Sequence, residues 1–232
     1  MLGFFTGVGA FFQGVRFIAR SPRLWALSLV PAVTAVVLAV VLALTGSHFA
    51  LAGARRAFGD GFREKLLAAG IVTVVVLLAI VLAVSLAQPL SGWALEGIVR
   101  AQERALNAAT FEPPPRLAAT IRSAVSSLIA LAVGIPTIAA LAIVGWVVPP
   151  AAIATVPLKV AVTALLLAWD LLDYPLGLRR ISLGGRVVWC ARHFGAVLGL
   201  GLAAALFFAI PGLGLLALPC GVAAATRLAA SR

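Results

Sequence analysis

The chain has 232 residues, of which 63% are hydrophobic and 11% charged, and its formal net charge at pH 7 is +11. A soluble globular domain is about 45–50% apolar and about 25% charged, so this composition excludes a soluble enzyme, a disordered tail and a nucleic-acid-binding protein. The mean hydropathy of +1.14 indicates an integral membrane protein. The excess cations lie between apolar runs, where the positive-inside bias and anionic lipid headgroups account for them.

Residues 1–20 have the pattern of an amphipathic helix. Apolar side chains recur at helical spacing, and the polar and basic residues avoid that face. Such a stripe predicts a helix that lies at the membrane interface; the alternative is an ordinary packed helix. The stripe consists of Phe4, Val8, Phe11, Phe12 and Val15.

Two long runs without charged residues predict two transmembrane helices. The runs cover 24–54 and 66–95, and about 20 apolar residues are enough to cross about 30 Å of hydrocarbon. We therefore expect spans at 24–45 and 66–87. Ser21 and Pro22 mark the start of the first span, because Ser is a preferred N-cap and Pro is favoured in the first helical turn.

The remainder predicts surface helices followed by two further apolar blocks. Residues 88–122 read as helix, rigid triple-proline turn and helix at the membrane surface, and the blocks 123–169 and 194–226 read as helical hairpins or paired spans. In the second block the pieces 194–209 and 212–226 reach only about 24 Å and about 22 Å, which favours a hairpin with its tip at 210–214. The expected fold is one all-α membrane domain with two long transmembrane helices, membrane-embedded hairpins and an N-terminal interfacial helix.

The distribution of cations predicts the orientation in the membrane. The connector between the two long spans holds four cations, whereas thirteen fall on the opposite face, whether the later blocks are hairpins or paired spans. The positive-inside rule then places both termini in the cytoplasm.

Asp170 and Asp173 are the most conspicuous charged pair near an apolar run, followed directly by Tyr174 and Pro175. Two carboxylates on one helix face are compatible with acid/base chemistry, as in an intramembrane aspartyl protease. The alternative is that they pair with Arg179, Arg180 or Arg186 and hold the helix end in place. We expect the structural role and no enzyme, because no second catalytic motif accompanies the pair. His48 and His193 are isolated, and no cluster has metal-ligand spacing, so no metal or cofactor is expected.

A candidate anion site lies at the start of the first span. A helix N-terminus presents unpaired N–H groups and a partial positive charge, here those of Arg23, Leu24 and Trp25, with Ser21 as the cap and Arg20 beside it. This arrangement suits sulfate, phosphate or a lipid headgroup. The alternative is that the arginines only anchor the helix. Lys159, between two apolar stretches, is either a pathway charge or a residue that snorkels to the interface.

Several segments, taken in order, resemble the CysZ sulfate-permease family of the etoposide-induced-protein domain superfamily. The resemblance is carried by residues 12–14 and 21–25 leading to Val30-Pro31, by 89–92 with Glu96, by Asp173-Tyr174-Pro175, and by Ile210-Pro211 with Pro219 and Ala225-Thr226. It implies a helical inner-membrane protein that oligomerises and takes up sulfate by a proton-linked or channel-like route.

One position departs from the family pattern. The family's sulfate-associated motif reads Gly-Leu-Arg, often with a second Arg, whereas this chain has Arg23, Leu24, Trp25 and Ala26 there. The expected partners are sulfate or a similar oxyanion, membrane lipids and further copies of the chain, with no nucleic acid. The competing function is that of a non-transporting membrane-shaping or scaffold protein of the same superfamily.

Overall fold

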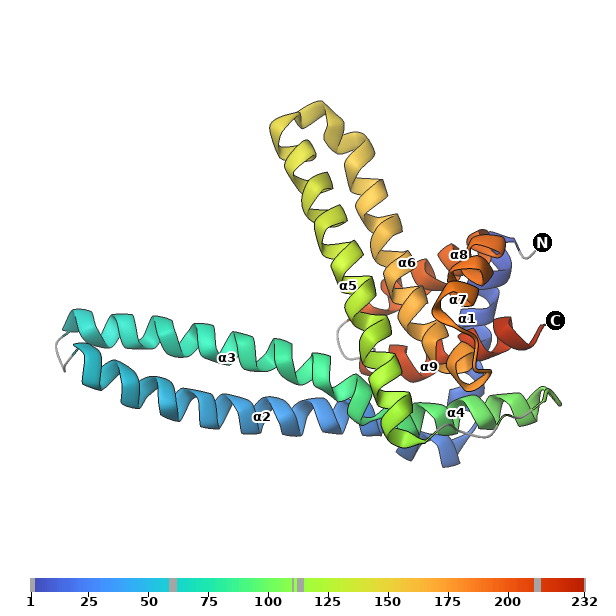
Figure 1. Cartoon of the computed structure of the whole chain (residues 1–232), viewed down its shortest axis with the longest axis horizontal. Helices are drawn as coiled ribbons and strands as arrows, with labels where there is room; N and C mark the ends of the chain where they lie inside the picture. Colours follow the sequence, from blue (N-terminus) through green and yellow to red (C-terminus); the bar gives the residue numbers. More distant parts are fainter. Residues whose placement is uncertain (1–2, 59–61, 110, 112–114, 211–213, 232) are drawn as a thin grey trace. The chain divides into compact units, whose positions relative to one another are not determined.

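The computed structural model describes residues 3–58, 62–109, 111, 115–210 and 214–231. Across these residues every regular element is a helix, as Figure 1 shows, which confirms the predicted all-α class. The chain divides into two compact units, residues Val30–Ser91 and residues Met1–Leu29 with Gly92–Arg232. The elements in chain order are α1 (Phe4–Ala19), α2 (Pro22–Phe58), α3 (Phe62–Leu90), α4 (Gly92–Ala105), α5 (Arg116–Val147), η1 (Pro149–Ala151), α6 (Ala152–Leu178), α7 (Leu183–Arg192), α8 (Phe194–Phe208) and α9 (Gly214–Ala230).

The smaller unit is an antiparallel pair formed by most of α2 and by α3 (Figure 1). The two helices approach closely where Gly46 faces Val75: a Cβ built on the glycine would lie 2.7 Å from a methyl carbon of the valine. Aliphatic side chains such as Val36, Val40 and Leu77 are more than half exposed. Outward-facing aliphatic side chains on a long helix suit a lipid environment, and Pro22–Ala54 is long and apolar enough to cross a membrane.

The larger unit contains a second long hairpin, formed by α5, η1 and α6. Its helices contain the segments Leu128–Val147 and Pro149–Leu178, each long and apolar enough to cross a membrane. The indole Nε1 of Trp169 donates a hydrogen bond to Ser126 Oγ at 3.0 Å, which joins the two helices. Residues 116–122, which we expected in a separate surface helix, are the first turns of α5. The helix is continuous through these residues, so α5 begins several residues before its long apolar segment.

The C-terminal part contains three shorter helices. α7 and α8 meet at His193 with a bend of 93°, and α8 and α9 contact each other. The bounds of α8 and α9 match the two short pieces expected within 194–226. Residues 211–213 of the predicted tip at 210–214 lie outside the described residues.

The first helix is packed against protein through its glycines. α1 contacts α8 and α9, and its buried face consists of Gly7, Ala10, Phe11, Gly14 and Ile18. The predicted aromatic stripe is therefore split: Phe11 is fully buried, whereas the ring of Phe12 is 61% exposed. These contacts agree with the alternative of a packed helix, and the position of α1 at the membrane interface stays a prediction. Close backbone approach depends on positions where side chains are absent.

Gly7 provides a test of this packing. A Cβ built on Gly7 would clash with the backbone carbonyl of Ala196 in α8, and backbone cannot move aside as a flexible side chain does. We expect Gly7→Ala to lower the stability by about 1–3 kcal/mol, seen as a lower midpoint of thermal unfolding in detergent. The matched control is Gly9→Ala on the same helix, where the nearest side-chain atom lies 3.9 Å away. That change should be neutral or stabilising, because Ala is the better helix former. Equal effects of the two variants would contradict the packing argument.

Candidate functional site

The turn between α1 and α2 places the predicted anion-binding residues. Arg20 caps the C-terminus of α1, with its N–H bonded to the carbonyl of Arg16 at 3.1 Å, and Ser21 donates its N–H to the carbonyl of Ile18 at 3.1 Å. The indole Nε1 of Trp25 reaches back to the same Ile18 carbonyl at 3.0 Å. The first turn of α2 is therefore tied to the last turn of α1.

The backbone at the start of α2 offers fewer free donors than expected. The N–H of Leu24 donates to the carbonyl of Ser21 at 2.8 Å, so it does not point toward an anion as the sequence interpretation assumed. The reason is the tight turn: it brings the carbonyl of Ser21, three residues before Leu24, within hydrogen-bond distance of the Leu24 N–H. An anion at this turn therefore depends more on arginine side chains than on backbone donors.

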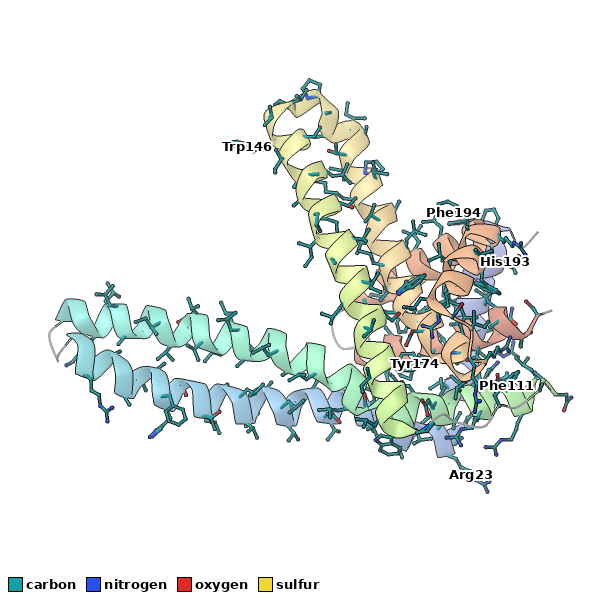
Figure 2. The ribbon with its side chains drawn as sticks, viewed as in Figure 1. Arg23, Phe111, Trp146, Tyr174, His193 and Phe194 are labelled. Carbon is teal, nitrogen blue, oxygen red and sulfur yellow. The ribbon has the colours of Figure 1, made fainter. Side chains whose placement is uncertain are left out.

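Those arginine side chains are exposed. Arg16, Arg20 and Arg23 all face solvent, and among the described residues none of them has an acidic ion-pair partner. Figure 2 shows the side chain of Arg23 extending away from the helices. Guanidinium groups left without carboxylate partners are available for charge-assisted hydrogen bonds to an oxyanion. Lys159, the other candidate cation, is half-buried in α6.

The structure places Asp173 in a buried ion pair. Its carboxylate accepts a hydrogen bond from Arg186 Nη1, and the two side chains are 7% and 2% exposed. Arg186 Nε also donates to the carbonyl of Ile181 at 3.2 Å. Of the three arginines that we considered as partners, Asp173 thus pairs with Arg186, across the turn between α6 and α7. Asp170 is half-buried in α6, one turn earlier.

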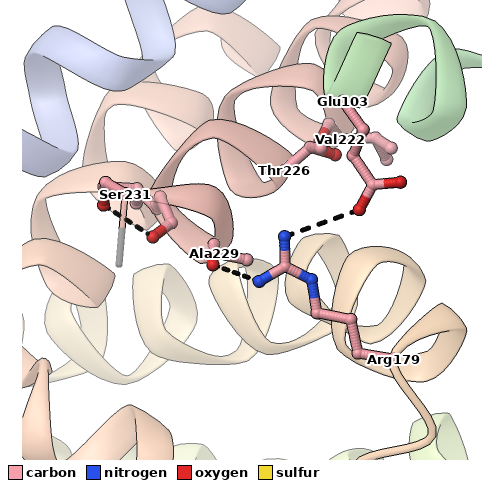
Figure 3. Close-up of polar contacts among 7 residues, drawn as sticks. Glu103, Arg179, Val222, Thr226, Ala229 and Ser231 are labelled. Atoms are coloured by element: carbon pink, nitrogen blue, oxygen red, sulfur yellow. Dashed lines mark hydrogen bonds and ion pairs between the residues drawn. The ribbon is translucent and has the colours of Figure 1, made fainter. Parts of the chain in front are cut away.

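A second buried ion pair was missed by the sequence analysis. Glu103 on α4 lies 3.5 Å from Arg179, whose other terminal nitrogen donates to the carbonyl of Ala229 in α9 (Figure 3). This one guanidinium therefore joins α4, the end of α6 and α9. A signal was available: Leu95, Val99 and Glu103 follow one another at four-residue spacing, which places the carboxylate on the buried face of an amphipathic helix.

Arg179 and Glu103 both lie near the C-terminal end of a helix, and the two helices end with the same hydrogen-bond pattern. In the turn after α6, Arg180 N–H bonds to the Gly177 carbonyl and Ile181 N–H to the Leu176 carbonyl, with Arg180 at φ 56°. This is the Schellman arrangement, which normally has glycine at the left-handed position. α4 ends in the same way with Asn107 at φ 50°. Arg179, which pairs with Glu103 of α4, is the residue just before this left-handed position.

Burial governs the protonation of Glu103. Removal from water raises the pKa of the Glu103 carboxyl above its usual value of 4.5, and the nearby Arg179 guanidinium opposes that shift without cancelling it. The oxygen Oε2 of Glu103 and the side-chain oxygen of Gln102 have no hydrogen-bond partner among the described residues. The charged carboxylate is therefore poorly solvated by the protein.

This pKa shift predicts how stability changes with pH. A carboxyl whose folded-state pKa is raised stabilises the fold below its unfolded pKa, and that contribution is lost as the pH rises through the folded value. The midpoint of thermal unfolding should therefore fall as the pH rises above 4.5, the usual pKa of a glutamate carboxyl, and the fall should be smaller in Glu103→Gln. Parallel pH profiles for the two proteins would contradict this assignment.

The buried pair of Asp173 and Arg186 gives a second prediction. Removing one partner leaves an uncompensated buried charge, which costs about 3–5 kcal/mol. We expect Asp173→Asn to lower the yield of folded protein in detergent, measured by size-exclusion chromatography. The double variant Asp173→Leu/Arg186→Met should recover much of that yield, because apolar replacement of both partners is often neutral. If Asp173→Asn left folding and oligomeric state intact and abolished an activity, the structural role would be wrong.

What the two ion pairs can do chemically follows from their partners. The carboxylate of Asp173 is held by the buried guanidinium of Arg186, so Asp173 serves to lock the α6–α7 turn. No group of three or more metal-ligating side chains occurs among the described residues. The arginines of the α1–α2 turn, in contrast, are exposed.

Comparison with known families agrees with the fold described above, an all-α membrane protein with cations at the start of a long helix. A family profile described as sulfate transporter CysZ/etoposide-induced protein 2.4 matches residues 10–219, which include the α1–α2 turn and both buried ion pairs. No individual curated protein matches the chain. Because the profile covers most of the sequence, the chain belongs to the sulfate transporter CysZ/etoposide-induced protein 2.4 family.

Proposed function

We propose that the protein is a permease or channel-like transporter of sulfate or a similar oxyanion in the bacterial inner membrane. The single observation that supports this most is a pair of exposed arginines, Arg20 and Arg23, at the start of a helix long enough to span, with no acidic partner among the described residues. The description of the family to which the chain belongs names a sulfate transporter. With both termini in the cytoplasm, as the cation distribution predicts, this turn faces the cytoplasmic interface.

The chemistry of the turn favours a doubly charged tetrahedral anion. Sulfate has four oxygens that accept several hydrogen bonds at once, whereas chloride is a single sphere. Each charge-assisted hydrogen bond from Arg20 or Arg23 contributes about 1.5–3 kcal/mol when it is partly shielded from water. The indole bond of Trp25 to Ile18 holds the end of α1 and the start of α2, which carry the two arginines, together.

A scaffold function is the second candidate, and one observation favours it. Trp25 and Ala26 occupy the positions where the resemblance leads us to expect arginines. The indole N–H, which is the one donor of the Trp25 side chain, already donates to the backbone of α1. A non-transporting member would need no anion ligands at these positions. In both proposals the protein is not an enzyme, it needs no cofactor, and it forms homo-oligomers.

Sulfate binding by an arginine variant tests the proposed site. Arg23→Ala should weaken sulfate binding by roughly tenfold, equivalent to about 1.4 kcal/mol, measured by isothermal titration calorimetry on the purified protein. The control is Arg192→Ala: Arg192 is exposed and adjoins His193, which lies far from Arg23 in Figure 2. The control should bind like the unmodified protein. Equal affinities for all three would mean that the arginines only anchor the helix to lipid headgroups.

A further inference from the structure

The bend of the α5–η1–α6 hairpin carries exposed apolar side chains and no charge. Trp146 and Ile153, on either side of η1, are each 85% exposed, and in Figure 2 the side chain of Trp146 lies close to this bend. No charged residue occurs between Arg122 and Lys159, whereas the connector of α2 and α3 holds four cations within residues 55–65. A bend with large exposed apolar side chains is poorly suited to bulk water.

The backbone of the same bend is poorly suited to the hydrocarbon core. In a continuous helix the carbonyls of Gly145 and Trp146 would accept from the N–H groups four residues later, but both of those residues are prolines, which have no N–H. The N–H groups of Val148 and Ala151 donate to the carbonyls of Val144 and Val148 instead. A lipid-exposed carbonyl without a donor is costly in hydrocarbon. The two carbonyls therefore need donors from water or from lipid headgroups.

The membrane interface satisfies both demands, and the apolar length of α5 reaches it. Leu128–Val147 has 20 residues, which correspond to about 30 Å of helix, the thickness of the hydrocarbon layer. When the start of this segment lies at one interface, the bend lies at the other. That layer offers hydrogen-bond donors together with contact to acyl chains, and tryptophan is enriched there.

Lys159 is placed on α6 so that its side chain extends toward the same bend. It follows Ala152, the first residue of α6, by a rise of about 10 Å. Its side chain is half-buried and has no acidic ion-pair partner among the described residues. Side chains on a helix lean toward its N-terminus, which for α6 is the bend. The aliphatic stem of Lys159 can therefore cover apolar surface while the ammonium extends toward the headgroups.

We propose that the α5–η1–α6 hairpin crosses the membrane and that its bend binds the headgroup layer of the opposite leaflet. The ring of Trp146 lies at that interface, and the ammonium of Lys159 is directed toward the lipid phosphates. Lys159 is then part of a lipid anchor and not of an anion pathway. The anchor does not depend on sulfate transport, and it distinguishes this hairpin from a re-entrant one, whose bend would end within the hydrocarbon.

Spin labels measure the depth of the hairpin in proteoliposomes of the full chain. The labelled variants are Leu128→Cys, Ile135→Cys and Ile153→Cys, all at exposed positions, in a background with Cys190→Ala and Cys220→Ala. Each variant is first shown to elute from a size-exclusion column like the unmodified protein. Electron paramagnetic resonance then compares collisions of each label with oxygen, which concentrates at the membrane centre, and with a water-soluble nickel chelate.

The expected depth profile is shallow, deep and shallow along the hairpin. The label at position 135 should lie about 15 Å deeper than the label at position 153, which is half of the hydrocarbon thickness. A label at position 153 as deep as the one at position 135 would overturn the proposal, because the hairpin would then end inside the hydrocarbon. Nickel access at position 153 equal to that of a label in water would also overturn it. So would spin–spin broadening at position 153 that disappears on dilution with unlabelled protein, because a second copy would then cover the bend.

Two substitutions of Lys159 test its part in the anchor. Lys159→Leu removes the ammonium, so the label at position 153 should move toward the membrane centre by about 3 Å, the rise of two helical residues. The matched control is Lys159→Arg, which should leave the label in place because arginine also extends its charge toward the interface. Uptake of radiolabelled sulfate, where it occurs, should be the same in both variants. An unchanged depth together with lost uptake in Lys159→Leu would overturn this role and assign Lys159 to an anion pathway.

Discussion

The larger unit depends on helix backbones that approach one another at glycine and alanine. Side chains would block the contacts of α1 with α8 and α9 at Gly7 and Gly14, and that of α8 with α6 at Gly201. In an apolar environment burial of a large aliphatic side chain gives little, so close van der Waals contact between backbones supplies much of the association energy. These contacts fix where α1 ends, and hence where the arginines of the α1–α2 turn stand.

The buried ion pairs are a second layer on this framework. Arg186 closes the α6–α7 turn onto Asp173, and Arg179 ties that turn to α4 and α9. Buried pairs of this type add little net stability but are costly to break, so they specify one arrangement of helices among several that the small-residue contacts alone would permit. Arg179 and Arg186 thus differ from Arg20 and Arg23, which are exposed and have no acidic partner among the described residues.

Much of the helix content was predictable, because charge-free runs and prolines are local signals. The pairing of residues distant in sequence was less so. Asp173 had three candidate arginines, and its pairing with Arg186 depends on the turn between α6 and α7, where Arg180 is left-handed. The glycines on the buried face of α1 could not be predicted from the apolar pattern, because glycine carries no hydropathy signal. The hydrogen bond from the Leu24 N–H to the Ser21 carbonyl follows from the tight turn between α1 and α2. No residue pattern in the sequence indicates how tight that turn is.

We propose that the arginines of the α1–α2 turn, which have no acidic partner among the described residues, serve anion transport across the membrane. The most direct measurement is uptake of radiolabelled sulfate into proteoliposomes that contain the purified protein. The account predicts saturable uptake above that of protein-free liposomes, reduced by excess unlabelled sulfate and unaffected by excess chloride. Uptake indistinguishable from that of empty liposomes, with protein shown to be folded and inserted, would contradict it.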